Sequence, residues 1–186
     1  VAALAGSLGA ALVSMVAALT HEKKGFEASH DEMDAMGNKA QEIKDRLSFL
    51  IDEDTNAFNT LMDANRLPSN SDEEKIAKRK VVLAANKYAI EIPLEAAELS
   101  LSVLEIANEL VKKGNPNSVS DVGVSGEVAL AAVRGACRYR GRGQESSSRC
   151  YSIRQWSAPY RHARAPSAAN YDSGENRWVI DRNRDR

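Results

Sequence analysis

The sequence predicts an all-α protein: an antiparallel bundle of four long helices over residues 1–137, followed by a non-globular tail over residues 138–186. Two observations predict this fold class. Apolar residues recur at three- and four-residue spacing over long stretches, as on the buried face of an α-helix. Residues that start and end helices stand at the borders of the same stretches. A chain of 186 residues has room for one sizeable core and a tail.

The first expected helix covers residues 1–20, which contain no charged side chain. That length is enough to cross a membrane. The segment is rich in alanine, glycine and serine, however, so its hydrophobicity is low for a membrane span. Small residues let helix backbones approach closely. We therefore expect the buried central helix of a soluble bundle and, because such a face usually packs against a partner, a homodimer.

The second expected helix covers residues 31–66 and ends at Leu67-Pro68, because the residue before a proline is pushed out of helical geometry. Asp54 falls within its predicted buried stripe. An isolated carboxylate facing a helical core is costly to ionise unless it is paired. We therefore expect Asp54 to be protonated, hydrogen-bonded, in a cavity, or paired with a neighbouring helix. The predicted stripe comprises Ala40, Ile43, Leu47, Leu50, Asp54, Phe58 and Leu61.

The third expected helix begins after Ser71, which forms a capping box with Glu74, and ends at Gly114 behind two lysines. Pro93 lies inside it and should kink it. Its apolar stripe comprises Val81, Ala85, Ala89, Ile92, Ala96, Leu99, Val103, Ile106 and Leu110.

A loop over residues 114–126 leads into the fourth expected helix, which runs to Ala136. Asn115 precedes a proline, which indicates a turn, and Ser118 with Asp121 predicts a second capping box. The alternative for Asp121 is a ligand site formed with the exposed amides of the helix start.

Cys137 and Cys150 are the only cysteines, and they have neither zinc-ligand spacing nor a disulfide pattern. We expect no metal and a reducing, cytoplasmic location. The three histidines have no ligand spacing and no nucleophile partner, so no role is assigned to them.

The tail differs from the rest in composition. Residues 138–186 contain 11 Arg and no Lys, whereas Lys outnumbers Arg by 10 to 4 before them. Aromatic residues among many arginines are typical of nucleic-acid binding. The alternative is that the segment is disordered or translated out of frame. A swap of Lys for Arg together with the absence of Leu is what an out-of-frame reading would produce, and we favour that explanation over nucleic-acid binding. Without a genuine basic tail, no nucleic-acid partner is expected.

The segment up to Cys137 resembles the cyclodeaminase domain of formiminotransferase-cyclodeaminase, a group that includes bacterial methenyltetrahydrofolate cyclohydrolases. The family has a glycine-rich turn just before the point of Val1, and it continues helically after Cys137, where this sequence departs from it. The matching pieces are VAALAGSLGAALVSMVAALT, the T-x-x-K-K-x-F segment at 20–26, IDEDTNAFNTLMDANRLP at 51–68, Glu73-Glu74-Lys75, Ile92-Pro93-Leu94, GNPNSVSDVGVSG at 114–126, and RGAC at 134–137.

The resemblance implies an all-helical, dimeric, cytoplasmic folate enzyme without metal or organic cofactor. It would close 5-formiminotetrahydrofolate to 5,10-methenyltetrahydrofolate and release ammonia. The alternatives are a methenyltetrahydrofolate cyclohydrolase and a catalytically silent helical oligomerisation module.

The resemblance also suggests roles for particular residues. Asp54 would carry protons between the folate N10 and the departing nitrogen, with Asp121 as its partner. Two side chains would bind the pterin edge, and three cations would hold the glutamate carboxylates of the substrate. The alternative is that these cations only lie in solvent at the ends of helices, where positive charge is favourable, and bind no substrate. The pterin-binding residues are Asn115 and Ser120; the cations are Lys23, Lys24 and Arg66.

Overall fold

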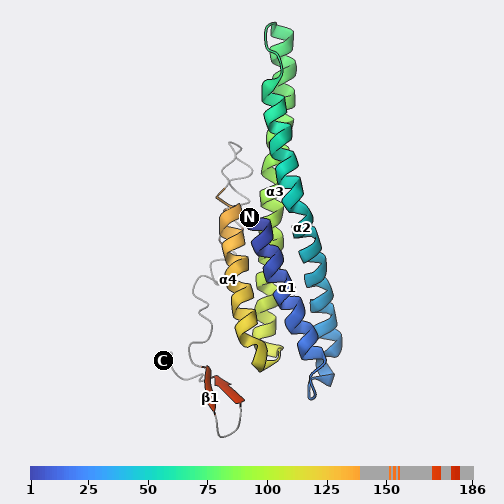
Figure 1. Ribbon diagram of the computed structural model, residues 1–186, viewed down its shortest axis with the longest axis vertical. Helices are drawn as coiled ribbons and strands as arrows, with labels where there is room; N and C mark the ends of the chain where they lie inside the picture. Colours follow the sequence, from blue (N-terminus) through green and yellow to red (C-terminus); the bar gives the residue numbers. More distant parts are fainter. Residues whose placement is uncertain (139–150, 152, 154, 156–168, 173–176, 181–186) are drawn as a thin grey trace.

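The computed structural model describes residues 1–138, residues 151, 153 and 155, and two short strands. The described chain contains four long helices in an antiparallel bundle (Figure 1). The expected all-α bundle is thus confirmed. The helices are α1 (Ala2–His21), α2 (His30–Arg66), α3 (Asp72–Lys113) and α4 (Val119–Ala136).

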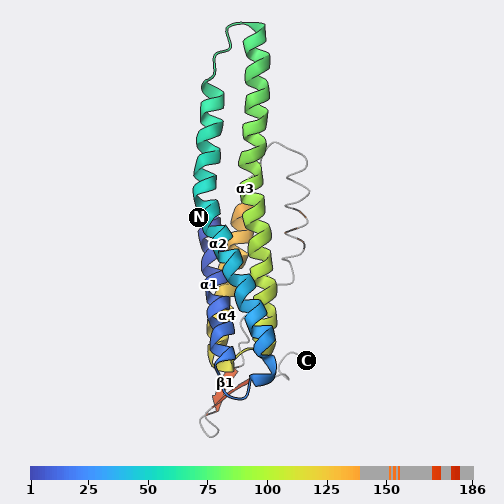
Figure 2. The same ribbon diagram turned by 90° about the vertical axis from the view of Figure 1, so that its right-hand side faces the viewer.

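The helices form two layers, because α1 packs on α2 and lies beside α4, which packs on α3. Helices α2 and α3, with 37 and 42 residues, are about twice as long as α1 and α4, with 20 and 18. The α2–α3 hairpin therefore extends far beyond the α1–α4 layer (Figure 2). We call its protruding part, residues 54–88, the arm.

The lower limit of the arm follows from two contacts. Ser7 of α1 hydrogen-bonds to Ser48 of the antiparallel α2 at 3.0 Å, so Val1, six residues earlier, is level with Asp54, six residues later. A Cβ atom at Gly135 would lie 3.8 Å from the Cβ of Ala2, so α4 ends where α1 begins. The two ends form a ledge at the base of the arm.

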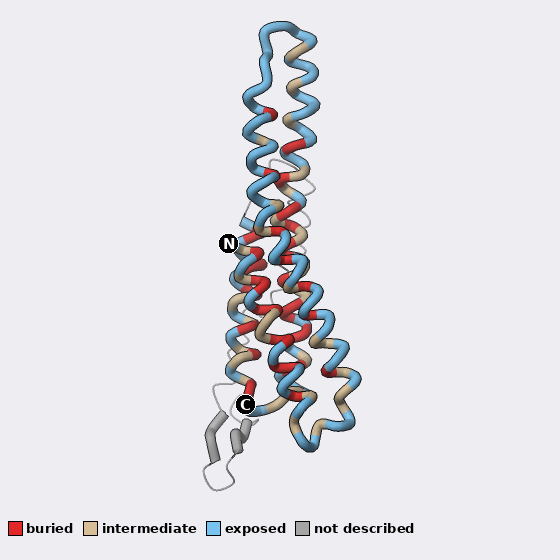
Figure 3. Tube along the Cα trace, turned by 45° about the vertical axis from the view of Figure 1, so that its right-hand side comes forward, coloured by how far each residue is buried: buried red, intermediate tan, exposed pale blue. Residues whose placement is uncertain are grey.

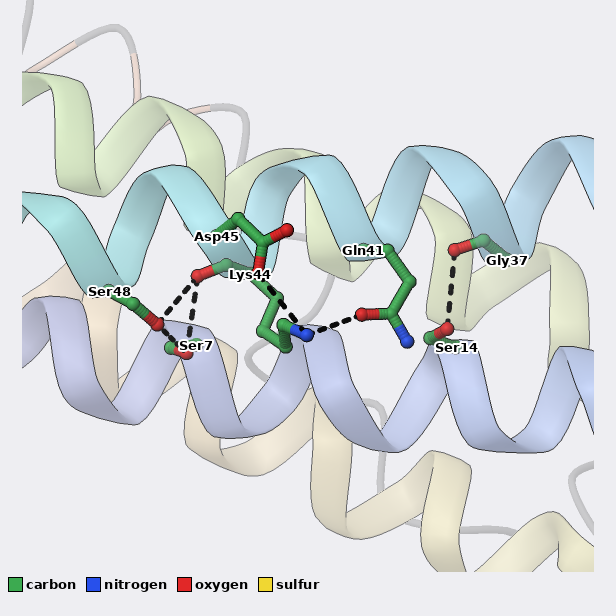
Figure 4. Close-up of polar contacts among 7 residues, drawn as sticks. All are labelled: Ser7, Ser14, Gly37, Gln41, Lys44, Asp45 and Ser48. Carbon is green, nitrogen blue, oxygen red and sulfur yellow. Dashed lines mark hydrogen bonds and ion pairs between the residues drawn. The ribbon is translucent and has the colours of Figure 1, made fainter.

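Small residues of α1 bring the backbones close together within this one chain. A Cβ atom at Gly6 would lie only 2.4 Å from the Oγ of Ser100. The Ser125 hydroxyl donates a hydrogen bond to the carbonyl oxygen of Gly9 at 2.8 Å. On the α2 side, Ser7 meets Ser48, and Ser14 donates to the carbonyl of Gly37 at 3.2 Å (Figure 4). The small-residue face is therefore covered by α2, α3 and α4, and it does not itself supply the partner surface on which the homodimer expectation rested.

Helix α1 is also long and apolar enough, by length and composition, to span a membrane. Half of its most apolar window is buried against the other helices, as in the core helix of a soluble protein. The central position expected for residues 1–20 is confirmed.

The buried stripe of α2 differs from the predicted one. Ala57 and Ala64 are buried, whereas Asp54 and Phe58 are exposed. The reason lies in the neighbouring helix. Asp54 does continue a row of seven-residue steps from Ala40 and Leu47, but α1 covers that row only as far as the ledge. The prediction that Asp54 is buried is wrong because its cover ends just below it.

Helix α3 begins as predicted. The Ser71 hydroxyl accepts a hydrogen bond from the Glu74 amide at 3.1 Å, and the Glu74 carboxylate accepts one from the Ser71 amide at 3.3 Å. The helix continues through Pro93, and the expected kink there stays a prediction. Val81, predicted in the stripe, is exposed because it lies in the arm.

The second predicted capping box is absent at the start of α4. Ser118 is the N-cap residue, but its side chain makes no capping hydrogen bond. A short 3-10 turn, Pro116–Ser118, precedes the helix, and Asn115 caps this turn by accepting a hydrogen bond from the Asn117 amide at 3.0 Å. The capping role therefore belongs to Asn115.

Two strands in the tail, β1 (Ala169–Asp172) and β2 (Arg177–Ile180), pair antiparallel, with Tyr171 opposite Trp178. The sequence pattern did not predict this hairpin. Ile153 is buried and belongs to the apolar core. The expectations of disorder and of nucleic-acid binding concern residues that lie mostly outside the described ones.

Candidate functional site

Two segments that carry the family resemblance meet where α1 ends and α4 begins. Thr20, fully buried, accepts a hydrogen bond from the Asn115 amide at 2.9 Å and donates one to the Val16 carbonyl at 2.7 Å. The Lys23 ammonium donates to the Oδ1 of Asn115 at 2.6 Å. We call Thr20, Lys23 and Asn115 the junction cluster. It joins residues that are more than ninety positions apart in the sequence.

The loop after α1 orients Lys23. Its ammonium lies 5.5 Å from the centre of the Phe26 ring, a cation–π distance. Gly25 has a φ of 92°, a left-handed conformation that favours glycine. The Gly25 amide donates to the Glu27 carboxylate at 3.0 Å, and this bond holds the pKa of Glu27 below its ordinary value. Lys23 is therefore held half-buried over a short, fixed loop.

Further charges surround this end of the bundle. Lys113, at the end of α3, binds Glu32 of α2 at 2.5 Å and Glu109 at 3.4 Å. The hydrogen bond with Glu32 raises the pKa of Lys113, and the hydrogen bond with Lys112 lowers that of Glu109. The pair of Lys113 with Glu32 ties α2 to α3 next to the junction cluster, whereas Glu109 pairs with lysines of its own helix.

The other predicted residues near this end are less constrained. Lys24 and Ser120 are exposed. Asp121 is half-buried in the first turn of α4, where the partial positive charge of the helix start favours a carboxylate. The structure thus brings Lys23 and Asn115 into contact and places Asp121 on the helix that follows Asn115.

The remaining two predicted residues lie far away. Asp54 is exposed at the ledge, and Arg66 is exposed near the tip of the arm, where it binds Asp63 at 3.2 Å. Because α1 has 20 residues and a helix rises 1.5 Å per residue, its two ends are about 30 Å apart. Within one chain, Asp54 and Arg66 therefore cannot belong to one site with Lys23.

Several polar contacts were not predicted from the sequence. Thr20 is a central hydrogen-bonding residue of the junction cluster. The rings of His21 and His30 stack with centroids 4.0 Å apart, and His21 Nδ1 lies 2.9 Å from Asp34. The only local signal for these contacts was polar residues next to an apolar helix, which is too common to be diagnostic.

Two further contacts link α2 to α3 at the base of the arm. Arg46 binds Glu95 through two hydrogen bonds of 2.6 and 2.9 Å. Tyr88 donates to the Glu53 carboxylate, which raises the pKa of Tyr88. These contacts fix the α2–α3 spacing where the arm leaves the bundle.

The junction cluster offers an ammonium and an amide that are already oriented, with carboxylates close by. Such donors suit an anionic ligand that has hydrogen-bonding heteroatoms. Among the described residues, no group of three His, Cys, Asp or Glu side chains is placed to hold a metal ion.

The chain is similar to several known proteins. The chain is 37% identical over 135 residues to the methenyltetrahydrofolate cyclohydrolase of Methylorubrum extorquens and spans 65% of that protein. It is 30% identical over 136 residues to the formimidoyltransferase-cyclodeaminase of Mus musculus, of which it spans 25%. The solved structure of a formiminotetrahydrofolate cyclodeaminase from Thermotoga maritima has the same fold, with a TM-score of 0.70 at 22% identity, covering 86% of this chain and 81% of that one. The family model described as formiminotransferase-cyclodeaminase matches residues 1–139, so the chain belongs to the formiminotransferase-cyclodeaminase family.

Proposed function

We propose that this chain converts one-carbon groups carried between N5 and N10 of tetrahydrofolate. Membership of the family supports the substrate class. The observation that carries the proposal is the contact between Lys23 and Asn115, because it joins the two motifs of the resemblance that hold suitable donors. Lys23 would bind an anionic part of the folate, and Asn115 would bind a pterin heteroatom.

The reaction we favour is cyclisation of 5-formiminotetrahydrofolate. N10 attacks the formimino carbon and loses its proton, and the formimino nitrogen gains protons and leaves as ammonia. One carboxylate can take the first proton and return it to the leaving nitrogen. We propose Asp121 for this step, because it is half-buried and begins the helix next to Asn115. Asp54 is the competing candidate, and its position at the ledge separates it from the junction cluster.

Hydrolysis of 5,10-methenyltetrahydrofolate is the second candidate. The 37% identity to the Methylorubrum extorquens cyclohydrolase favours it, since the identity to the mouse protein is 30%. Water then adds to the same carbon, and a carboxylate in the same place would accept the water proton. We propose that neither reaction needs a metal or organic cofactor and that the protein acts in the cytoplasm.

Assays of the purified full chain with both substrates distinguish the candidates. Ammonia release from 5-formiminotetrahydrofolate supports cyclodeamination, and loss of methenyl absorbance without ammonia supports hydrolysis. If the protein shows neither of these two activities, the proposal is contradicted, and a catalytically silent helical module is the remaining explanation.

The neighbouring lysines provide a matched test of the binding site. Lys23→Ala should raise KM about tenfold, because it removes a charge-assisted contact to the substrate. Lys24→Ala should change KM less than twofold, because Lys24 is exposed outside the junction cluster. Steady-state kinetics measure both, and equal effects would show that the lysines act only through net charge.

A further inference from the structure

The side-chain amide of Asn115 has a fixed orientation. Two donors face its Oδ1 atom: the Lys23 ammonium at 2.6 Å and the backbone amide of Asn117 at 3.0 Å. An ammonium and a backbone N–H group can only donate hydrogen bonds, so both must face the oxygen of the side-chain amide and not its NH2 group. The neighbours of Asn115 therefore define which atom of its amide is the oxygen.

The backbone of Asn115 is held as firmly as its side chain. Its amide donates to the Thr20 hydroxyl at 2.9 Å, and its carbonyl oxygen accepts from the Ser118 amide at 3.0 Å. The Thr20 hydroxyl is fully buried and donates to the Val16 carbonyl, which fixes its position. Buried residues occupy the interior of the four-helix body down to this end, where α1 meets the start of α4 (Figure 3). The backbone N–H, the carbonyl and the Oδ1 of Asn115 are therefore all occupied.

The Nδ2 group is the part of Asn115 that is left for a ligand. Within the described residues, its two N–H bonds have no hydrogen-bond partner, and Asn115 is only half-buried. Lys23 has three N–H bonds and gives one of them to Asn115, so it also has donors to spare. These two side chains therefore offer donors, and no acceptor, to a ligand.

We propose that Asn115 determines specificity at the junction cluster by binding the oxygen on C4 of a pterin ring and by rejecting an amino group at that position. This inference rests on the proposed function and names the atom that Asn115 recognises. A pterin carries an acceptor, the C4 oxygen, and a donor, the amino group on C2. An amide that offers only N–H bonds suits the edge with the oxygen, so it also sets which way round the ring enters. An amino group on C4 would place N–H against N–H and leave both donors unpaired.

A purely structural role for Asn115 leads to a different expectation. Asn and Asp are about equally good at accepting backbone hydrogen bonds at the start of a helical turn. A carboxylate would also accept the hydrogen bond from Lys23, with added attraction between opposite charges. Asn115→Asp therefore keeps every contact that the structure gives to Asn115 and removes only the two free N–H bonds.

Calorimetric titration of the full chain with two ligands tests the proposal. One ligand is 5-formyltetrahydrofolate, in which a formyl group replaces the formimino group, so no ammonia can leave. The other is its counterpart with an amino group in place of the C4 oxygen. Wild type should bind the C4-oxygen compound at least about tenfold more tightly than the amino compound. Asn115→Asp should bind the C4-oxygen compound at least about tenfold more weakly than wild type does, and its preference should vanish or reverse.

Asn117→Asp is the matched control. Asn117 is exposed two residues away, and within the described residues its side chain makes no hydrogen bond. The substitution adds the same charge in solvent, so it should leave both affinities within about twofold of wild type. Thermal unfolding followed by circular dichroism should give the same midpoint for both variants and wild type.

The possible failures are distinguishable. An unchanged ligand preference in Asn115→Asp would overturn the role of Asn115, and so would equal weakening by Asn115→Asp and Asn117→Asp, which would assign the effect to charge. Binding of both ligands to wild type without preference overturns this inference alone. Binding of neither ligand to wild type contradicts the proposed function and this inference with it.

Discussion

At the scale of single residues, the two candidate carboxylates occupy different environments. Asp121 is half-buried in the first turn of α4, the helix that follows Asn115, and Asp54 is exposed at the ledge, about 30 Å from the junction cluster along α1. The distance means that at most one of them can act on a substrate held by Lys23.

Asp121→Asn should lower kcat about a hundredfold, the usual contribution of a general acid–base group, with an unchanged unfolding midpoint. Asp54→Asn should leave kcat within about threefold, because Asp54 lies far from the junction cluster. Steady-state kinetics and thermal unfolding of both variants check this prediction. The reverse pattern would place the chemistry at the ledge and make Asp121 a structural residue.

Contacts between single side chains were the least predictable feature of the sequence. The choice of Lys23 and Asn115 came from the family resemblance, and the structure brings these two into contact. Thr20 was missed because its hydrogen bond to Asn115 spans 95 residues, a distance over which no periodic pattern carries information. The burial of Asp54 was mispredicted although its phase on the helix was right. Burial depended on where another helix stops.

At the scale of helices, close packing of α1 limits which residues it can contain. Gly6→Ala should destabilise the protein by about 1–3 kcal/mol, because the added Cβ would lie 2.4 Å from Ser100 Oγ and 3.1 Å from Leu47. Gly126→Ala in α4 should stabilise it by about 0.5–1 kcal/mol, because no atom of the described residues lies within 4 Å of the added Cβ and alanine favours helix. Urea unfolding of both variants measures the two changes, and a neutral Gly6→Ala would contradict the close approach of α1 and α3.

The base of the arm should respond to alkaline pH. The hydrogen bond to Glu53 raises the pKa of Tyr88 above 10.0, so the neutral phenol is favoured in the folded protein. The resulting stabilisation is complete below pH 10 and is lost as the pH rises through the folded pKa. A difference titration of tyrosine absorbance between wild type and Tyr88→Phe should give a midpoint above 10.0. A midpoint at or below that value would mean that the bond is absent in solution.

Helix boundaries were predictable because their signals are local. The apolar periodicity, the Ser71 capping box and Leu67-Pro68 each act within a few residues, and the structure agrees with all three. The capping box predicted at Ser118 is absent, because a 3-10 turn directly precedes α4. The β1–β2 hairpin was missed because its strands have only four residues each, too few for an alternating pattern to stand out.

At the scale of the whole molecule, the body and the arm differ in how they are stabilised. The body has four packed helices, whereas the arm, in the part of the chain that the structure describes, has only α2 and α3 (Figure 2). A two-helix hairpin has few buried contacts and opens readily. Amide hydrogen exchange should therefore be faster for residues 54–88 than for the buried residues of α1. Equal protection of the arm and of α1 would contradict this difference in stability.

The contact between Ser125 and Gly9 has a consequence for synthesis of the chain. It joins residues 116 positions apart. At about 5–20 residues per second, a ribosome needs roughly ten seconds to deliver α4 after α1 has been made. During that time the first helix, whose residues 1–20 carry no charge, is exposed to water because the last of the helices that later cover it has not yet been made. The α2–α3 hairpin can already form, since its two helices are adjacent in the sequence. We expect the nascent chain to depend on ribosome-associated chaperones for that interval, and its yield in a foreign host to be set by how well α1 is shielded there.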